Sequence, residues 1–401
     1  MIQFKHFMIV FKTLKSYCPK FSHFSNFRIH KMNEMTLRTL NIPSSDIDHL
    51  FSFCKKDNLE KLKKGLKRGY KEIKSIPEIW ISDYSSQTFS LAHICASYGS
   101  IKCLQYLLAH GSPPSQENNK KWNSLHFASR HGYLEIAKIL VMNGVSVNST
   151  TIEGYTPFEL ACWFRYLDLA QFLLQSGANP QIIDSFGCNS LHRACQSTSP
   201  QIVKFLVDIG LDPNLPNNEG PPIMISIIGG DIESVKILLD GGVDPNSVFN
   251  KRPILHTAIL NFRLEIAVLL LNRGADVNSL DSLDNTPLHH AVWLLQEKTV
   301  KLLLERGANI NAQNSTKQTP LHKAAEIGSA LIFNDLLDAG ADIKMEDVVH
   351  KTPLDWARME EHDVILNAWQ KRVDAKKKKE EEDQLEKAKV ANHQSELDLL
   401  L

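Results

Sequence analysis

Histidine and cysteine are the residues in this chain that could bind a metal or take part in acid–base or nucleophilic chemistry. Six histidines recur in step with a period of about 33 residues: His93, His126, His192, His256, His289 and His322. A metal site needs ligands that converge on one point, whereas residues one repeat apart form a ladder. We therefore predict that these histidines are structural, and that the chain has no metal site and no catalytic residue. The adjacent pair His289 and His290 adds no site, because neighbours on a helix point in different directions.

The cysteines also fit a structural role. Seven are present, an odd number without any C-x-x-C pair, which argues against a disulfide framework and against a zinc site. Five of them take helix positions that suit a small apolar residue: Cys54, Cys95, Cys103, Cys162 and Cys195. Cys188 is instead expected at a loop tip, with an accessible thiol. This cysteine usage predicts a reducing compartment, the cytoplasm, with the nucleus as the alternative.

Composition and motifs argue against several classes of function. Lys plus Arg and Asp plus Glu both number 45, so the chain lacks the basic footprint of a nucleic-acid-binding protein. Apolar runs of about 18 residues, which would predict a membrane span, are absent. The sequence contains no G-x-x-x-x-G-K-[ST], G-x-G-x-x-G, G-x-S-x-G or H-E-x-x-H motif. We predict a monomer that is not an enzyme, uses no cofactor and binds no nucleic acid.

The ladder of histidines belongs to an internal repeat. Glycines follow leucine-rich runs with the same period: Gly69, Gly111, Gly144, Gly177, Gly210, Gly242, Gly274, Gly307 and Gly340. Within one period, Thr319 is a good helix N-cap and Pro320 suits the first helical turn. Gly328 ends this short helix, and an amphipathic second helix continues to Gly340. Each period is therefore predicted to form a helix, a turn, a second helix and a loop.

The repeated stretches resemble the ankyrin repeat, which carries a T-P-L-H-x-A signature. They read NSLHFA, TPFELA, NSLHRA, PILHTA, TPLHHA, TPLHKA and TPLDWA. The resemblance covers about Asp46 to Trp369 and implies an all-α solenoid of about nine to ten stacked helix–turn–helix units with short β-hairpin-like loops. It also implies that the histidine of the signature forms hydrogen bonds within the loop scaffold and between neighbouring units.

A basic leader precedes the repeats, which span residues 46–369. Residues 1–35 contain no acidic residue before Glu34. We interpret them as a disordered extension, or as a spurious start upstream of Met32 or Met35. An organelle transit peptide is the alternative, since such segments are basic and poor in acidic residues.

A charged tail follows the repeats. Residues 370–401 are predicted to form an exposed helix, in which Lys376–Lys379 stand four residues before Glu380–Asp383. Pairs of opposite charge at this spacing stabilise a helix by a few tenths of a kcal/mol each.

The resemblance to ankyrin repeats implies reversible recognition of a protein partner on the concave surface, which is built from loop tips and first helices. The chain is thus predicted to be a protein–protein interaction module or scaffold. The first alternative is an adaptor that recruits a client to an enzyme complex such as a ubiquitin ligase or a kinase, with the C-terminal tail as its second docking segment. The second alternative, a fragment of an enzyme or transporter, would need an additional domain or membrane helices.

Partner-binding residues are predicted from the register of the repeats. In an ankyrin-like unit, the loop residue before the T-P pair and the two residues after the alanine positions face the groove. In the units at Leu125 and Phe158 these residues include the types found at binding hot spots: Trp122, Arg130, His131, Tyr155, Trp163 and Phe164. Trp293 and Leu294 form a lesser apolar spot. The alternative is that these aromatic residues pack between repeats as part of the core.

Overall fold

The computed structural model describes residues 44–69, 81–82 and 88–398. The predicted basic leader over residues 1–35 lies outside these residues. Within them the chain forms twenty helices in ten consecutive pairs, which confirms the predicted all-α array. The pairs are α3 (Ser44–Lys55) with α4 (Leu59–Gly69), α5 (Leu91–Tyr98) with α6 (Ile101–Ala109), α7 (Ser124–His131) with α8 (Leu134–Met142), α9 (Pro157–Trp163) with α10 (Leu167–Gln175), α11 (Ser190–Gln196) with α12 (Pro200–Asp208), α13 (Pro222–Gly229) with α14 (Ile232–Asp240), α15 (Ile254–Leu260) with α16 (Leu264–Asn272), α17 (Pro287–Trp293) with α18 (Glu297–Glu305), α19 (Pro320–Ile327) with α20 (Ala330–Asp338), and α21 (Pro353–Met359) with α22 (Asp363–Asp398). Two short antiparallel hairpins are β1 (Ile81–Ser82) with β2 (Thr88–Phe89) and β3 (Val248–Phe249) with β4 (Arg252–Pro253).

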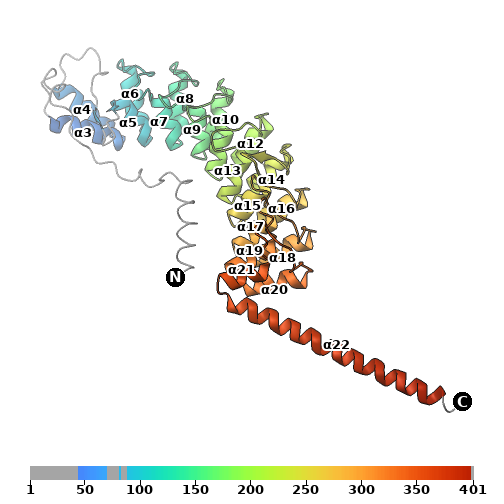
Figure 1. Cartoon of the computed structure of the whole chain (residues 1–401). Helices are drawn as coiled ribbons and strands as arrows, with labels where there is room; N and C mark the ends of the chain where they lie inside the picture. Colours follow the sequence, from blue (N-terminus) through green and yellow to red (C-terminus); the bar gives the residue numbers. More distant parts are fainter. Residues whose placement is uncertain (1–43, 70–80, 83–87, 399–401) are drawn as a thin grey trace. The chain divides into compact units, whose positions relative to one another are not determined.

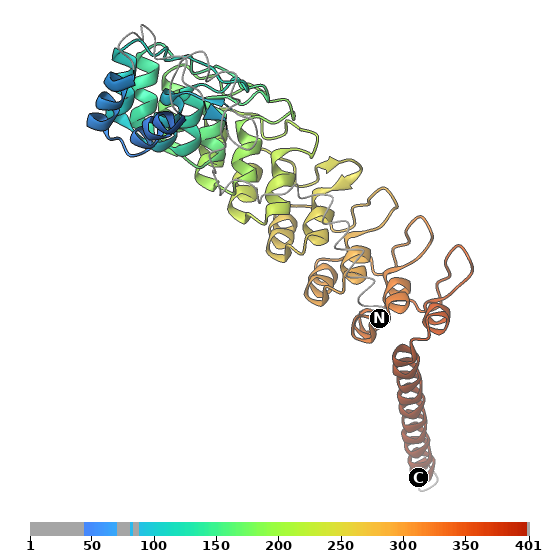
Figure 2. The same cartoon turned by 90° about the vertical axis from the view of Figure 1, so that its left-hand side faces the viewer.

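The chain divides into two compact units, Met1–Arg193 and Ala194–Leu401. In each unit the first helices of successive pairs pack in one layer and the second helices pack in another (Figures 1 and 2). In the first unit α7 packs between α5 and α9, and α8 packs between α6 and α10. In the second unit α15 packs between α13 and α17, and α16 packs between α14 and α18. Hairpin-like loops project from these layers, most visibly between the pairs of the second unit in Figure 2.

Helix α19, the first of the pair α19 and α20, illustrates how the sequence determines where a helix begins and ends. The Thr319 hydroxyl accepts a hydrogen bond from the backbone N–H of His322, and the N–H of Thr319 donates to Nδ1 of His322 at 3.0 Å. Pro320 lies in the first turn, where no N–H donor is needed. Gly328 ends the helix with a φ of 83°, a left-handed conformation that suits glycine. The predicted start and end of this helix are confirmed.

The second ring nitrogen of the repeated histidines, Nε2, links neighbouring repeats. Nε2 of His289 donates to the carbonyl of Gln318 at 3.0 Å. Nε2 of His322 donates in the same way to the carbonyl of Lys351, also at 3.0 Å. Burial lowers the pKa of His289 to about 4, so this ring is neutral at pH 7. Both histidines therefore have the scaffold role that the resemblance to ankyrin repeats implies.

An aspartate or asparagine shapes the loop before several of the first helices. Oδ1 of Asp184 accepts two backbone N–H groups, from Phe186 and from Cys188, both at 2.8 Å. The same turn recurs at Asn118, Asp281, Asn314 and Asp347. Since one oxygen holds the turn, the other oxygen of each aspartate is left for a side chain of the following helix.

The cysteines of the described residues are all buried: Cys54, Cys95, Cys103, Cys162, Cys188 and Cys195. This confirms the core position predicted for five of them. The exposure expected for Cys188 is wrong, because that residue is only 2 % exposed. Its backbone N–H is held by Oδ1 of Asp184, and the resulting turn folds Cys188 back against the scaffold.

The last helix, α22, continues through the boundary predicted at residue 370, since it runs from Asp363 to Asp398. Two of the predicted ion pairs form along it, Lys376 with Glu380 at 4.0 Å and Lys378 with Glu382 at 3.9 Å. In the part of the chain that the structure describes, no helix has the length and apolar character needed to cross a bilayer.

Candidate functional site

Arg193 on α11 is enclosed by aromatic side chains of the first unit. Its guanidinium carbon lies 4.3 Å from the ring centroid of Trp163, 5.2 Å from that of Tyr155 and 5.8 Å from that of Phe186. The rings of Tyr155 and Trp163 meet edge to face at 5.6 Å. Because ring faces attract a cation, Arg193 holds these rings together. We refer to five residues as the aromatic cluster: Tyr155, Trp163, Phe164, Phe186 and Arg193.

Two buried carboxyl groups pair with Arg193. Its Nε donates to Oε1 of Glu159 at 3.0 Å, and its Nη2 donates to Oδ2 of Asp184. Oδ1 of Asp184 is already held by the loop turn. All three side chains are almost inaccessible to solvent. Such a group is fixed in place, because removal of one partner leaves a buried charge uncompensated.

Glu159 occupies the position that histidine takes in the T-P-L-H-x-A stretches. Burial raises the pKa of Glu159 to about 8; the nearby Asp184 carboxylate adds to the rise and Arg193 opposes it. Burial also raises the pKa of Tyr155 to about 12. At pH 7 Glu159 is therefore mainly in its neutral, protonated form, and its Oε1 accepts the hydrogen bond from Arg193 without a full negative charge.

The outer edge of the aromatic cluster is exposed apolar surface. Phe186 is 50 % exposed and Phe164 is 38 % exposed. The Phe164 ring stacks on Trp163 at 5.7 Å. The guanidinium of Arg130, on α7, lies 5.7 Å from the Phe164 ring centroid and so extends the cluster to the preceding repeat. The cluster thus exposes aromatic rings to solvent, and these rings lie above the buried, paired side chain of Arg193.

The prediction that Trp122 faces a partner is wrong. This residue is only 8 % exposed, and its ring packs 5.1 Å from that of Phe127 and 5.8 Å from that of His126. Its backbone N–H donates to Oδ1 of Asn118 at 2.8 Å. The loop turn therefore fixes Trp122 against α7, and the alternative of a core role holds for this residue.

The other residues predicted in the first unit lie in the cluster or beside it: Tyr155, Trp163 and Phe164 within it, and Arg130 and His131 on α7. His131 is half-buried, and its ring stacks with that of Tyr133 at 6.4 Å. Burial lowers the pKa of His131 to about 4, and the charge of Arg130 contributes. His131 is thus a neutral ring at pH 7 rather than a charged contact.

In the second unit, Trp293 ends α17 and Leu294 follows it. Trp293 is 37 % exposed, whereas Leu294 is half-buried. The Trp293 ring centroid lies 6.4 Å from that of His290. The lesser apolar spot therefore lies beside a group of polar side chains.

Sequence reasoning missed Glu159, Asp184, Phe186 and Arg193. A signal was present, because the residue after the histidine position pairs with an aspartate nine residues earlier. This pairing occurs three times among the described residues: Arg193 with Asp184, His290 with Asp281, and Trp356 with Asp347. The aspartate and its partner lie in different parts of one period, so the pair is visible in the sequence only after the repeats have been aligned.

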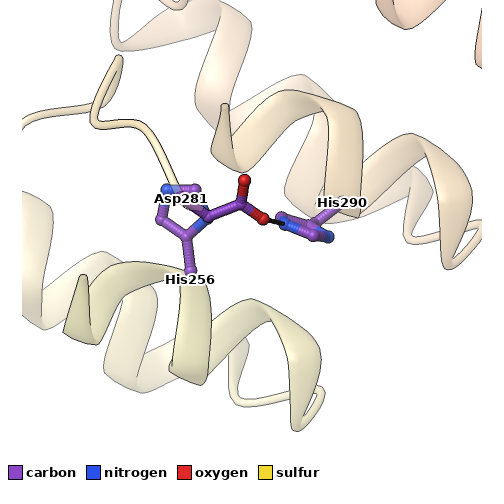
Figure 3. A group of neighbouring side chains, drawn as sticks. All are labelled: His256, Asp281 and His290. Carbon is purple, nitrogen blue, oxygen red and sulfur yellow. Dashed lines mark hydrogen bonds and ion pairs between the residues drawn. The ribbon is translucent and has the colours of Figure 1, made fainter. Parts of the chain in front are cut away.

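A group of side chains in the second unit could hold a metal ion. His256, Asp281 and His290 each offer one ligand atom, and these atoms lie within 4.8 Å of one another (Figure 3). Nε2 of His290 is 2.7 Å from Oδ2 of Asp281. The rings of His256 and His290 meet edge to face at 5.3 Å. His290 points in a different direction from its neighbour His289, as the sequence predicts. This direction places His290 beside His256, the histidine of the preceding repeat.

The protonation of this group suits a cation. Burial lowers the pKa of His256 to about 4, so its ring is neutral at pH 7. Burial opposes ionisation of Asp281, but hydrogen bonds from His290 and the loop backbone prevail and lower the pKa of Asp281 below its usual range. Neutral imidazole and ionised carboxylate are the forms that bind metal ions.

Comparison with known protein families matches residues 92–184, 158–249 and 223–314 to a model described as ankyrin repeats in three copies, and residues 296–343 to one described as ankyrin repeats in many copies. The matches to the first model extend over more than half of the chain. Among solved structures, the crystal structure of the human ASB11 ankyrin repeat domain is 29% identical in sequence, with a TM-score of 0.50, and the similarity covers 54% of this chain and 98% of that one. A search of curated proteins gave no match.

Proposed function

Because this chain belongs to the ankyrin-repeat family, we propose that it binds a partner protein through the aromatic cluster of its first unit. Ankyrin repeats are general protein–protein interaction modules, and they present extended surfaces for binding. The observation that carries the proposal is the exposure of Phe164 and Phe186 above the buried group of Arg193, Glu159 and Asp184.

The buried group of Arg193, Glu159 and Asp184 makes this surface rigid before a partner binds. Arg193 contacts the faces of three rings while two carboxyl groups hold its guanidinium. Ordering side chains on association costs about 0.5–1.5 kcal/mol for each flexible side chain. Rings that are already fixed avoid much of this cost. Trp, Tyr and Arg are also the residue types that most often dominate binding energy.

Neighbouring loop tips extend the apolar surface. The N–H of Ser185 donates to the carbonyl of Glu153 at 2.9 Å, and the N–H of Ile152 donates to the carbonyl of Lys120 at 3.1 Å. These bonds join three successive loops of the first unit. Ile152 and Ile183 are exposed near the tips. We infer a partner that inserts aliphatic or aromatic side chains between the tips and the rings.

The proposal is tested by replacing both exposed rings, Phe164→Ala and Phe186→Ala, in the full chain. Partner proteins are captured from native lysate and quantified by mass spectrometry. At a cost of about 2 kcal/mol for a hot-spot residue, the double variant is expected to retain less than about a tenth of the partner. Its melting temperature should stay close to that of the wild type, since neither ring is buried.

Phe262→Ala is the matched control, because Phe262 is an exposed phenylalanine of the second unit, 54 % accessible to solvent. It should capture the partner at the wild-type level. Full capture by the Phe164 and Phe186 double variant would place the binding surface elsewhere. A large fall in its melting temperature would show that these rings belong to the core.

A further inference from the structure

We propose that His256, Asp281 and His290 form a binding site for one divalent first-row transition-metal ion, with water completing the coordination. The site lies in the second unit and is independent of the aromatic cluster. Two imidazoles and one carboxylate, without a thiolate, are a donor set that suits Zn²⁺ and its neighbours in the first transition row.

The spacing of the three ligand atoms is close to that of a metal site. They lie within 4.8 Å of one another, and the Asp281 to His290 pair is at 2.7 Å. Around a tetrahedral ion with bonds of about 2.0–2.1 Å, ligand atoms are about 3.4 Å apart. The Asp281 and His290 pair must therefore open slightly, while His256 moves toward it by about 1 Å or more. Small rotations of the three side chains provide this movement.

The surroundings hold two of the ligands as metal sites usually do. Nε2 of His256 donates to the carbonyl of Ser279 at 2.9 Å, which leaves Nδ1 as its ligand atom. Oδ1 of Asp281 accepts the backbone N–H groups of Leu283 and Asn285 at 2.8 and 2.9 Å, which leaves Oδ2 to face His290. Carbonyl and backbone partners of this kind orient ligands and set their protonation.

Nδ1 of His256 is buried and has no hydrogen-bond partner among the described residues. In the next repeat, the N–H and hydroxyl of Thr286 both donate to Nδ1 of His289, at 3.1 and 2.8 Å. Pro253 takes the place of that threonine before His256, and proline has neither group. An unsatisfied buried acceptor destabilises the folded chain. A metal ion at Nδ1 removes this destabilisation.

The equivalent positions of the first unit already hold a cation. Glu159, Asp184 and Arg193 have the same sequence spacing as His256, Asp281 and His290. There the guanidinium lies between two carboxyl groups, those of Glu159 and Asp184. In the second unit no side chain of the three carries a permanent positive charge, and a bound divalent ion takes the role that the guanidinium has in the first unit.

Zinc titration of the untagged full chain tests the proposal. The chain is first treated with a chelator, which is removed before zinc is added. Isothermal titration calorimetry is expected to give one Zn²⁺ per chain. His290→Gln removes a ligand. Pro253→Thr keeps all three ligands but supplies the N–H and hydroxyl that would occupy Nδ1 of His256. Each substitution should weaken zinc binding by about tenfold or more, the range found when ligand-orienting contacts are lost.

His350→Ala is the control, because His350 is exposed, pairs with Glu346 and lies outside the site. It should bind zinc as the wild type does. Circular dichroism checks that each variant is folded, and Pro253→Thr is expected to fold because it restores the capping box seen at Thr286. Absence of stoichiometric zinc in the wild type, or unchanged affinity in either variant, overturns the site.

Discussion

Replacing Arg193 with Ala is expected to lower the free energy of unfolding by about 3–5 kcal/mol, the usual cost of breaking a buried ion pair by removing one partner. The substitution leaves Oδ2 of Asp184 and Oε1 of Glu159 without the guanidinium that now pairs with them. Three aromatic rings also lose the cation that lies against their faces. The loss of stability should therefore come with loosening of the aromatic cluster.

Urea unfolding followed by circular dichroism measures this effect. Arg273→Ala is the matched control, since Arg273 pairs with Asp240 at 2.7 Å but both side chains are partly exposed. Exposed pairs contribute about 0–1 kcal/mol. If Arg193→Ala costs no more than Arg273→Ala, the buried group does not hold the first unit together.

The stability of the wild type is expected to fall between pH 5 and pH 9 because of Glu159. Its pKa in the folded chain is raised to about 8 from an ordinary 4.5. The unfolded chain therefore releases this proton at a lower pH than the folded chain does. The contribution to stability is complete below about pH 4.5 and is lost as the pH rises through about 8. At about 1.4 kcal/mol for each pKa unit, the loss amounts to several kcal/mol.

Glu159→Gln should remove this pH dependence, because glutamine keeps an oxygen for Nε of Arg193 and has no proton to release. The free energy of unfolding of both proteins is measured across this pH range. The difference, wild type minus variant, should decrease as the pH rises. Glu135→Gln serves as the control, since Glu135 is exposed and pairs only with Lys138 on its own helix. If the free energies of unfolding of the wild type and Glu159→Gln change in parallel with pH, the raised pKa of Glu159 is contradicted.

The repeat and its helix limits could be predicted because they depend on neighbours in the sequence. Thr319 caps its helix through His322, three residues away, and Gly328 ends it through its own backbone conformation. The same capping box recurs at Ser90, Asn123, Thr286 and Thr352, so the register follows from the sequence. The link from His322 to the next loop could be expected only through the resemblance to ankyrin repeats.

The direction of loop side chains could not be predicted in the same way. Trp122 and Cys188 occupy the same place in their repeats, directly before the helix N-cap, and both were expected to be exposed. Both are buried, because Asn118 and Asp184 bind their backbone N–H groups. Register gives the position of such a residue, whereas a turn that begins four residues earlier decides which way it faces.

The buried charged group was missed for a related reason. Arg193 directly follows His192 in NSLHRA, a stretch that matches the repeat pattern. Its partner Glu159 lies 34 residues away and stands in a position that usually holds histidine. Departures from the repeat consensus, rather than matches to it, mark the residues with unusual chemistry in this chain.

Covalent capture of the partner from a defined position tests the central claim most directly. The photoreactive residue p-benzoylphenylalanine replaces Phe164 in one protein and Phe262 in another, and each is irradiated in native lysate. Both positions are exposed, and they lie in different units. A partner protein cross-linked from position 164, and not from position 262, is the predicted result. Cross-linking from position 262 alone, or with equal yield from both positions, would contradict binding through the aromatic cluster.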